Sequence, residues 1–563
     1  MKNQYCYSPL ERHDQTRLLC LLPGTDSSAL AGEIHHTDLT TCPSYEALSY
    51  EWGSQRKEHT ISLTGGTHIA ITTSLYHALH DLRFEKLPRL IWADGICIHQ
   101  DDIEERQKQV SMMGVVYSRA CRVITYIGPE MDGSTMAIDF AAELLFKHHT
   151  AGISTRNSEN GSVDLGLPPP SDPRYLALKK LILRGWSTRS WCAKEFLLNS
   201  NLILLCRRKA IDWFAISAIV QLCIERNLPA YLIPHTMEDL QDRRDCLIKL
   251  WVLRQQISAG DQLSFLEFLR MFHPFQATDP RDKIYSLYGL LNENETKTIP
   301  VDYDITAEQL FITVAVQILS SSPCLDILYS NFGNKTLKLP SWVPDWSTWR
   351  VASQGLALNH TYLACGSTIP QYRLRSMTEL DVSGCLVDQI AQQSERIGQR
   401  FAFIGAPGQD TWLKEQLEFV CKAEPYPTGE QISSVLWRTM IGNTTFDEEE
   451  AGEDYGRYFE AYRSFSERSS PTQNRMGREF VTAVRRRSRY RRLCLTEKGY
   501  FAAVPEGAEL GDWIVMFHGM RLLFVVRQNQ SHFTYIGHAY VHGLMKGEVL
   551  QLPSYERYTI TLA

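Results

Sequence analysis

Several short motifs with well-defined chemistry are absent from this chain of 563 residues. There is no G-x-G-x-x-G fingerprint, which disfavours a hydride-transferring dinucleotide enzyme, and there is no Walker A loop for a nucleoside triphosphate. The 14 cysteines are scattered and form no C-x-x-C pair. We therefore expect no metal site and no disulfide framework, and the thiols suit a reducing compartment.

Long apolar runs and a strong charge of one sign are also missing. No run approaches the roughly 20 residues of a membrane span, and the N-terminal residues lack the apolar segment of a secretory signal. The formal net charge of −6 gives no general attraction to nucleic acid or anionic lipid. We expect a cytoplasmic protein with no membrane partner, and nucleic acid is not an expected partner either.

The chain is too long for a single core, and its composition, 44% hydrophobic and 22% charged, is that of a globular protein. We expect an α/β domain over residues 1–210, with its motifs concentrated in 45–197. A helical region over 211–350, a mixed region over 351–470 and a β-rich module over 471–563 would follow.

Short apolar strands alternate with helices in the first of these parts, which favours a parallel sheet with helices on its faces. Ligands of such sheets bind outside the carboxyl ends of the strands. A loop rich in Pro, Ser and Gly is expected over Gly152–Asp172. The expected strands are Ala47–Tyr50, Leu90–Ala93, Arg122–Ile127 and Leu202–Cys206, and the expected helices are Thr72–Leu82 and Ile103–Tyr117.

The later regions carry fewer signals of chemistry. Asp279-Pro280 looks like a helix start, and Leu339–Ser347 is expected to be a rigid turn region. The last 75 residues predict a small antiparallel barrel or sandwich without a nucleophile–base constellation, so we expect a structural or regulatory role for them.

Two clusters of charged or titratable residues in these regions are explained by structural roles, without a functional site. The arginine run Arg485–Arg492 could bind nucleic acid, but an acidic run at Asp447–Asp454 favours a solvated or internally paired segment. Four histidines match no zinc spacing and are expected to be structural: His518, His532, His538 and His542.

Polar and aromatic residues follow the ends of two expected strands and are the candidate substrate-binding residues. Asp94 and Cys97 follow the second strand, where Asp94 could hold a substrate hydroxyl or simply fix the turn before Gly95. Cys97 could pair with His99 as a nucleophile, but a buried hydrophobic role is the alternative. At the first junction Trp52 could stack on a base, or it could only pack beneath the loop. The residues at that junction are Ser49, Tyr50, Trp52 and Gly53.

Four blocks of the first 200 residues resemble the HET domain, the heterokaryon-incompatibility domain of filamentous fungi. The family usually has Asn where this chain has His99, and Gln where it has Lys194. The resemblance implies a role in non-self recognition and programmed cell death, with a protein partner or self-association. The blocks are Tyr45–Gly53, Leu90–Gln109, Tyr117–Gly128 and Leu183–Glu195.

The segment S-T-R-S-W-C-A-K-E-F at residues 187–196 is also similar to a helix of TIR domains, which are flavodoxin-like. Some TIR domains hydrolyse NAD+, and their catalytic Glu corresponds to Glu195. The likeness implies a TIR-like sheet, Trp191 in the substrate site and NAD+ as a substrate rather than a cofactor.

Glu195 is the candidate catalytic residue, because a carboxylate can stabilise the oxocarbenium-like state of a breaking glycosidic bond. The alternative is a structural ion pair with Arg184 or Arg189. Three mechanisms therefore stay open: NAD+ hydrolysis, a non-enzymatic assembly module, and a small-molecule enzyme of a biosynthetic pathway. A pocket that holds Glu195 beside Trp52 would favour an enzyme, whereas a flat, filled crevice would favour assembly.

Overall fold

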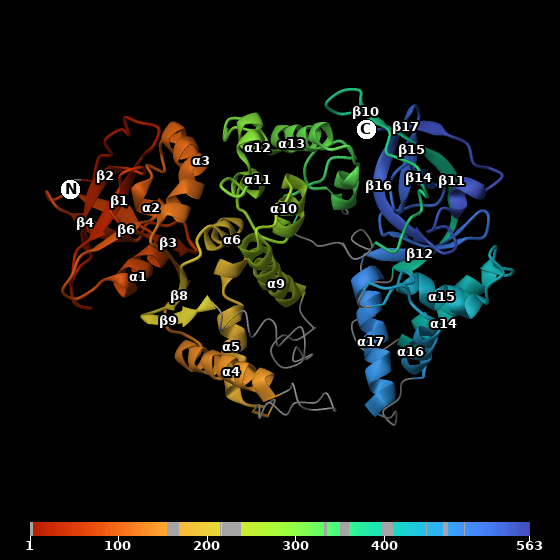
Figure 1. Ribbon diagram of the computed structural model, residues 1–563, viewed down its shortest axis with the longest axis horizontal. Helices are drawn as coiled ribbons and strands as arrows, with labels where there is room; N and C mark the ends of the chain where they lie inside the picture. Colours follow the sequence, from red (N-terminus) through yellow and green to blue (C-terminus); the bar gives the residue numbers. More distant parts are fainter. Residues whose placement is uncertain are drawn as a thin grey trace. The chain divides into compact units, whose positions relative to one another are not determined.

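The computed structural model describes residues 4–154, 168–169, 171–213, 216, 238–331, 335–348, 360–396, 409–445, 448–464, 471–488 and 490–563. The chain divides into two compact units, residues 1–306 and 307–563. Figure 1 shows the helices and strands of each unit, and each unit is described by itself.

A mixed sheet forms the core of the first unit, and in the described residues it has nine strands in the order β5-β4-β2-β1-β6-β3-β7-β8-β9. Its centre is parallel, since β3 pairs in parallel with β6 and β7, and β7 with β8. The outer pairings of β1 with β2 and β6, and of β8 with β9, are antiparallel. The strands are β1 (Gln15–Leu21), β2 (Ala31–Asp38), β3 (Glu46–Tyr50), β4 (His59–Leu63), β5 (His68–Ile71), β6 (Arg89–Trp92), β7 (Arg122–Gly128), β8 (Leu202–Cys206) and β9 (Lys209–Asp212).

The four expected strands are the four central ones, β3, β6, β7 and β8, and the α/β class is confirmed. The expectation of a parallel sheet holds only for this centre. Numbered along the chain, the central strands lie in the order 2-1-3-4, as in the first part of a flavodoxin-like sheet. The antiparallel strands on both sides depart from that topology, so a TIR-like fold is not confirmed.

Helices cover the sheet because side chains alternate between its faces along each strand. The buried apolar residues of α1, among them Leu75 and Leu79, belong to one hydrophobic cluster with Leu48 and Ile124 of the sheet. Helix α6 packs against β3 and β7. The expected helices correspond to α1 and α3, while most of the expected loop Gly152–Asp172 lies outside the described residues. The helices are α1 (Thr73–Leu82), α2 (Asp94–Cys97), α3 (Ile103–Arg119), α4 (Ser134–Ser154), α5 (Pro173–Ile182) and α6 (Ser190–Leu197).

The helical middle region packs against α3 and α6 within the same unit. The amide of Ser190 donates to the carbonyl of Gln276 at 2.9 Å, which ties the start of α6 to the segment before α11. Nearby, Gly114 of α3 and Gly289 approach so closely that a Cβ on Gly114 would lie 2.5 Å from the Gly289 Cα. The expected helix start at Asp279-Pro280 falls just before α11. The helices of this region are α9 (Glu238–Ala259), α10 (Phe265–Phe272), α11 (Asp282–Tyr285) and α12 (Glu293–Thr298).

The second unit contains an almost entirely antiparallel sheet that closes on itself. Its strands follow the order β10-β11-β12-β13-β16-β15-β14, and β14 pairs back to β11. Strand β11 pairs with both β14 and β12 and so closes the sheet, because β-bulges bend it between these two pairings. The barrel alternative for the C-terminal residues is therefore the one observed, and it includes strands that precede residue 471. The strands are β10 (Tyr372–Leu374), β11 (Leu380–Arg396), β12 (Arg491–Thr496), β13 (Phe501–Pro505), β14 (Trp513–Phe517), β15 (Leu523–Asn529), β16 (His532–Val541) and β17 (Tyr558–Leu562).

Two arginines of the arginine-rich run have partners inside the fold of this unit. Arg491 is buried and donates to the carbonyl of His538 at 2.7 Å, and Arg487 pairs with Glu448 of the acidic run at 3.9 Å. His518 and His542 are likewise held by hydrogen bonds within the barrel. Of the helices that the structure describes, none is both long and apolar enough to cross a membrane. The helices of the unit are α13 (Ala307–Ser321), α14 (Gln409–Val420), α15 (Ile432–Met440), α16 (Asp454–Arg463) and α17 (Pro471–Ser488).

We predict that Gly114→Ala destabilises the protein even though alanine favours helices. Alanine would normally stabilise a helix interior by about 0.5–1 kcal/mol relative to glycine. Here the new Cβ meets the backbone of Gly289, which has a φ of +95° and little freedom to move, so we expect a net loss of about 1–3 kcal/mol. Thermal and urea unfolding measure this difference.

Ser118→Ala is the matched control, since Ser118 is an exposed residue of the same helix. It should change the free energy of unfolding by no more than about 0.5 kcal/mol. Equal stability of the Gly114→Ala variant and this control would show that the close backbone contact does not constrain the fold.

Candidate functional site

A cavity of about 240 Å³ lies in the first unit at the carboxyl ends of β3 and β6. Five separate chain segments contribute to it: the end of β3 with the loop after it, the stretch from α2 into α3, α6 with the residue before it, the segment from Gln276 into α11, and Tyr303 after α12. The lining residues are Tyr50, Trp52, Gln55, Asp94, Ile98, Gln100, Arg106, Val110, Met113, Arg189, Trp191, Glu195, Gln276, Ala277, Thr278, Asp279, Asp282 and Tyr303.

Trp52 and Asp94 are joined directly across the ends of the two strands. The indole Nε1 of Trp52 donates to Oδ2 of Asp94 at 2.8 Å, while Oδ1 accepts from the amide of Gly95 at 2.7 Å. Burial raises the pKa of the Asp94 carboxyl, although these two bonds and the charge of Arg189 act against that shift. Asp94 therefore fixes the turn before Gly95 and also holds an aromatic wall of the cavity.

Glu195 is buried, with 4% of its surface exposed, and it lines the same cavity. Burial raises the pKa of its carboxyl, and the nearby charge of Asp94 adds to the effect, while Ser49, Lys194 and Tyr117 oppose it. The expected convergence of Glu195, Trp52 and Asp94 on one crevice is what the structure shows.

Neither of the two arginines considered as partners forms an ion pair with Glu195 in the described residues. Arg184 instead donates to the carbonyls of Ile127 at 3.0 Å and Met131 at 3.2 Å. Arg189 lines the cavity, and its guanidinium makes no hydrogen bond or ion pair with any described residue. Burial acts to lower the pKa of Arg189, but Cys192, Asp94 and Glu195 outweigh it and raise the pKa.

A second indole of the cavity lining, that of Trp191, is also held by a carboxylate, that of Asp282. Nε1 of Trp191 donates to Oδ2 of Asp282 at 3.0 Å, and the hydroxyl of Tyr303 donates to Oδ1 at 2.7 Å. Burial raises the pKa of Asp282, and these two bonds oppose the shift. Two fixed indoles therefore line one small cavity.

Lys194, where the HET family usually has Gln, lies next to Trp191. Its side chain is fully buried, and its Nζ lies 4.3 Å from the centre of the Trp191 ring. Among the described residues, Nζ has no hydrogen-bond partner. Burial lowers the pKa of Lys194, and the carboxylates of Glu195 and Asp282 oppose the shift.

Three of the expected substrate-binding residues do not line the cavity. Ser49 is buried behind it, close to Glu195. Gly53 is exposed, with a φ of +62°. Cys97 is fully buried, its pKa is raised to about 12 by burial, and its thiol accepts from the amide of Ala93. The structure thus gives Cys97 the surroundings of a small hydrophobic residue.

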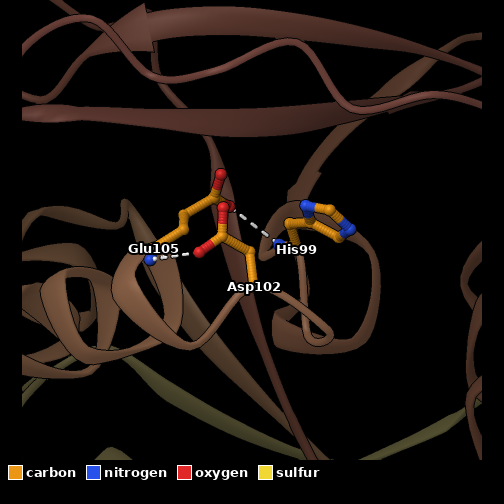
Figure 2. A group of neighbouring side chains, drawn as sticks. All are labelled: His99, Asp102 and Glu105. Atoms are coloured by element: carbon orange, nitrogen blue, oxygen red, sulfur yellow. Dashed lines mark hydrogen bonds between the residues drawn. The ribbon is translucent and has the colours of Figure 1, made fainter.

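The closest approach to a metal-binding group in the described residues is His99, Asp102 and Glu105, whose potential ligand atoms lie within 4.8 Å of one another. Figure 2 shows these side chains at the start of α3. Glu105 accepts from Arg17 at 2.6 Å and from the His99 amide at 2.8 Å, and Asp102 caps the helix by accepting from the Glu105 amide. These carboxylates therefore serve the buried Arg17 and the helix start.

The sequence did not single out the residues that the middle region adds to the cavity. They come from Gln276–Asp279, Asp282 and Tyr303. The charged cluster A-T-D-P-R-D-K lies in an otherwise apolar stretch and was the available signal. Arg106, near the start of α3, is another lining residue that the sequence analysis does not predict.

The cavity combines a buried carboxylate of raised pKa, two indole walls and the guanidiniums of Arg106 and Arg189, neither of which makes a hydrogen bond or ion pair with a described residue. Perturbed carboxyls beside aromatic surfaces in a cleft are typical of sites that bind and transform a small molecule. The arrangement could hold a flat ring against an indole and stabilise a positive charge that develops beside Glu195.

Comparison with known proteins agrees with the resemblance seen in the sequence. Residues 45–195 match the family model described as Heterokaryon incompatibility protein (HET), and residues 407–559 match the Het-6 beta-barrel domain. The chain is 27% identical to Heterokaryon incompatibility protein 6, OR allele, of Neurospora crassa, over 92% of this chain and 91% of that protein. No solved structure matches. The chain therefore carries a HET domain and a Het-6 β-barrel domain, each matched over part of its length.

Proposed function

We propose that this protein acts in fungal heterokaryon incompatibility, and that its HET domain contributes as an enzyme that hydrolyses NAD+. The observation that carries the enzymatic part is the cavity that buried Glu195 lines together with Trp52 and Asp94. An assembly module needs an exposed complementary surface, and a concave site with a perturbed carboxyl is not required for it. A protein partner or self-association would trigger the activity and lead to cell death.

Hydrolysis of NAD+ breaks the bond between the nicotinamide nitrogen and the ribose carbon. The bonding electrons leave with nicotinamide, the ribose becomes oxocarbenium-like, and water then adds and releases a proton to give ADP-ribose. The ionised carboxylate of Glu195 would stabilise the positive ribose in a site that is largely closed to water. Its raised pKa reflects the energy of keeping that charge buried before the substrate arrives.

The walls of the cavity support a flat ring as the reacting part of the ligand. Trp52 and Trp191 are fixed at their Nε1 atoms, so neither indole must be ordered when a ring stacks on it. A cavity of about 240 Å³ is smaller than the roughly 300–1,000 Å³ of many ligand sites. The nicotinamide end would therefore enter, and the adenosine end would extend outward.

We predict that Glu195→Gln lowers NAD+ hydrolysis about a hundredfold, the equivalent of on the order of 3 kcal/mol of transition-state stabilisation. The amide keeps the shape of the side chain but lacks the charge. Release of nicotinamide by purified full-length protein is the measurement. Glu51→Gln is the control, because Glu51 is an exposed carboxylate that also acts on Arg189 but does not line the cavity.

The same Glu195→Gln variant should be as stable as the parent protein or more stable, and the difference should grow with pH. A carboxyl whose pKa is raised in the folded state contributes stability at low pH that is lost as the pH rises through the raised pKa. Removing the buried charge should therefore increase the melting temperature most at pH 8–9. A large fall in melting temperature would instead indicate a structural ion pair.

We predict that Lys194→Met moves the acidic limb of the activity profile to higher pH. Activity needs ionised Glu195, so it should disappear as the pH falls through the raised pKa of that carboxyl. The Lys194 cation opposes the shift, and its removal should raise the Glu195 pKa further. The measurement is kcat/KM across pH 5–9 for both proteins, and a limb at lower pH in the variant would contradict the role of Glu195.

A further inference from the structure

Two guanidiniums of the cavity differ from the other arginines around them. Arg106 and Arg189 both line the cavity, and neither makes a side-chain hydrogen bond or ion pair with a described residue. The Nε of Arg106 is buried without a partner. A guanidinium carries five donors and stays charged, so donors that are withdrawn from water without a partner destabilise the protein.

Neighbouring arginines of the same unit have partners for their terminal nitrogens. Arg17 donates to Glu105 through both terminal nitrogens, and Arg281 donates to Asp279 and to the carbonyl of Ile305. Arg254 donates to three backbone carbonyls: those of Phe196, Asn199 and Ser200. Arg106 and Arg189 differ from these arginines because neither guanidinium makes a hydrogen bond with a described residue.

The carboxylates of the cavity form no hydrogen bond with these two guanidiniums among the described residues, although the charges of Asp94 and Glu195 act on Arg189 and the charge of Asp279 interacts with Arg106. Asp279 is paired with Arg281 at 2.7 Å. Asp94 and Asp282 each accept from an indole, and Asp282 also accepts from Tyr303. The fourth carboxylate, Glu195, acts electrostatically on Arg189 without forming an ion pair with it.

Arg106 is also held in an orientation that suits a ligand. Its guanidinium carbon lies 4.8 Å from the centre of the Tyr303 ring, and Tyr303 is itself fixed by its bond to Asp282. A guanidinium stacked on a ring keeps its edge free to donate two parallel hydrogen bonds. Phosphate oxygens match that edge.

We propose that Arg106 and Arg189 form an anion subsite that binds a phosphate or diphosphate group of the ligand. This inference rests on the proposed function and extends it, because the diphosphate of NAD+ is then the group that these two residues hold while the nicotinamide end lies at Glu195. The subsite would equally fit another phosphorylated small molecule.

The test is calorimetric titration of the full-length protein with ADP-ribose, inorganic pyrophosphate and adenosine. Arg106→Gln and Arg189→Gln should each weaken binding of ADP-ribose and pyrophosphate about 10- to 100-fold. Arg106→Lys should recover part of the affinity, since it keeps the charge but not the fork. Adenosine binding should be the same in all these proteins.

Arg56→Gln is the matched control, because Arg56 is exposed on the loop after β3, next to Gln55, and does not line the cavity. It should leave every affinity unchanged. Thermal melting measures whether each variant is folded. If Arg189→Gln unfolds because Asp94 and Glu195 lose their counter-charge, the affinities of the two Arg106 variants test the subsite.

Two results would overturn the subsite: no binding of pyrophosphate or ADP-ribose by the parent protein, or equal binding by the parent and the Arg106→Gln variant. Failure of the proposed function has a different signature. Arginine-dependent binding of pyrophosphate without release of nicotinamide from NAD+ would retain the subsite and exclude NAD+ hydrolysis. Release of nicotinamide that does not change when either arginine is substituted would retain NAD+ hydrolysis and exclude the subsite.

Discussion

The close approach of two backbones at Gly114 and Gly289 is the constraint on which the cavity depends. Helix α3 contributes Arg106, Val110 and Met113 to the cavity lining, and the middle region contributes Asp282 and Tyr303, so the glycine contact joins two parts of the chain that line the cavity. A side chain at either glycine would push these two parts apart. The backbone bond between Ser190 and Gln276 fixes the third side, and together these contacts make the middle region part of the site.

The sequence was sufficient to predict the centre of the first sheet, because β3, β6, β7 and β8 are short apolar runs bounded by turns. The flanking strands carry a weaker signal. Strand β2, for example, has only one fully buried residue and contains charged and polar residues throughout. In the second unit, β11 contains bulges that interrupt the alternation of buried and exposed residues, so its pattern resembled no regular element.

Residues on one side of the cavity could be found from the sequence because they follow strand ends, where parallel sheets gather their ligand-binding groups. Trp52 and Asp94 are of this kind, whereas Glu195 lies in α6 and was indicated by the TIR-like segment at residues 187–196. For Cys97 the sequence left a site role and a buried hydrophobic role open, and the short helix α2 turns its thiol into the core. The second wall depends on how a segment some 80 residues after Glu195 packs back on α6 and α3, and no local pattern encodes that contact.

The order in which the lining residues occur along the chain has a consequence for the protein during its synthesis. A ribosome translates the strand ends and Glu195 long before it reaches Asp282 and Tyr303, which complete the cavity. A nascent chain, or a product truncated shortly after the HET motifs, therefore holds Glu195 in an open groove with one indole wall unsupported. Under the proposed function, a cell would be protected from the activity of incomplete copies, because only a chain that has passed residue 303 contains every residue that lines the site.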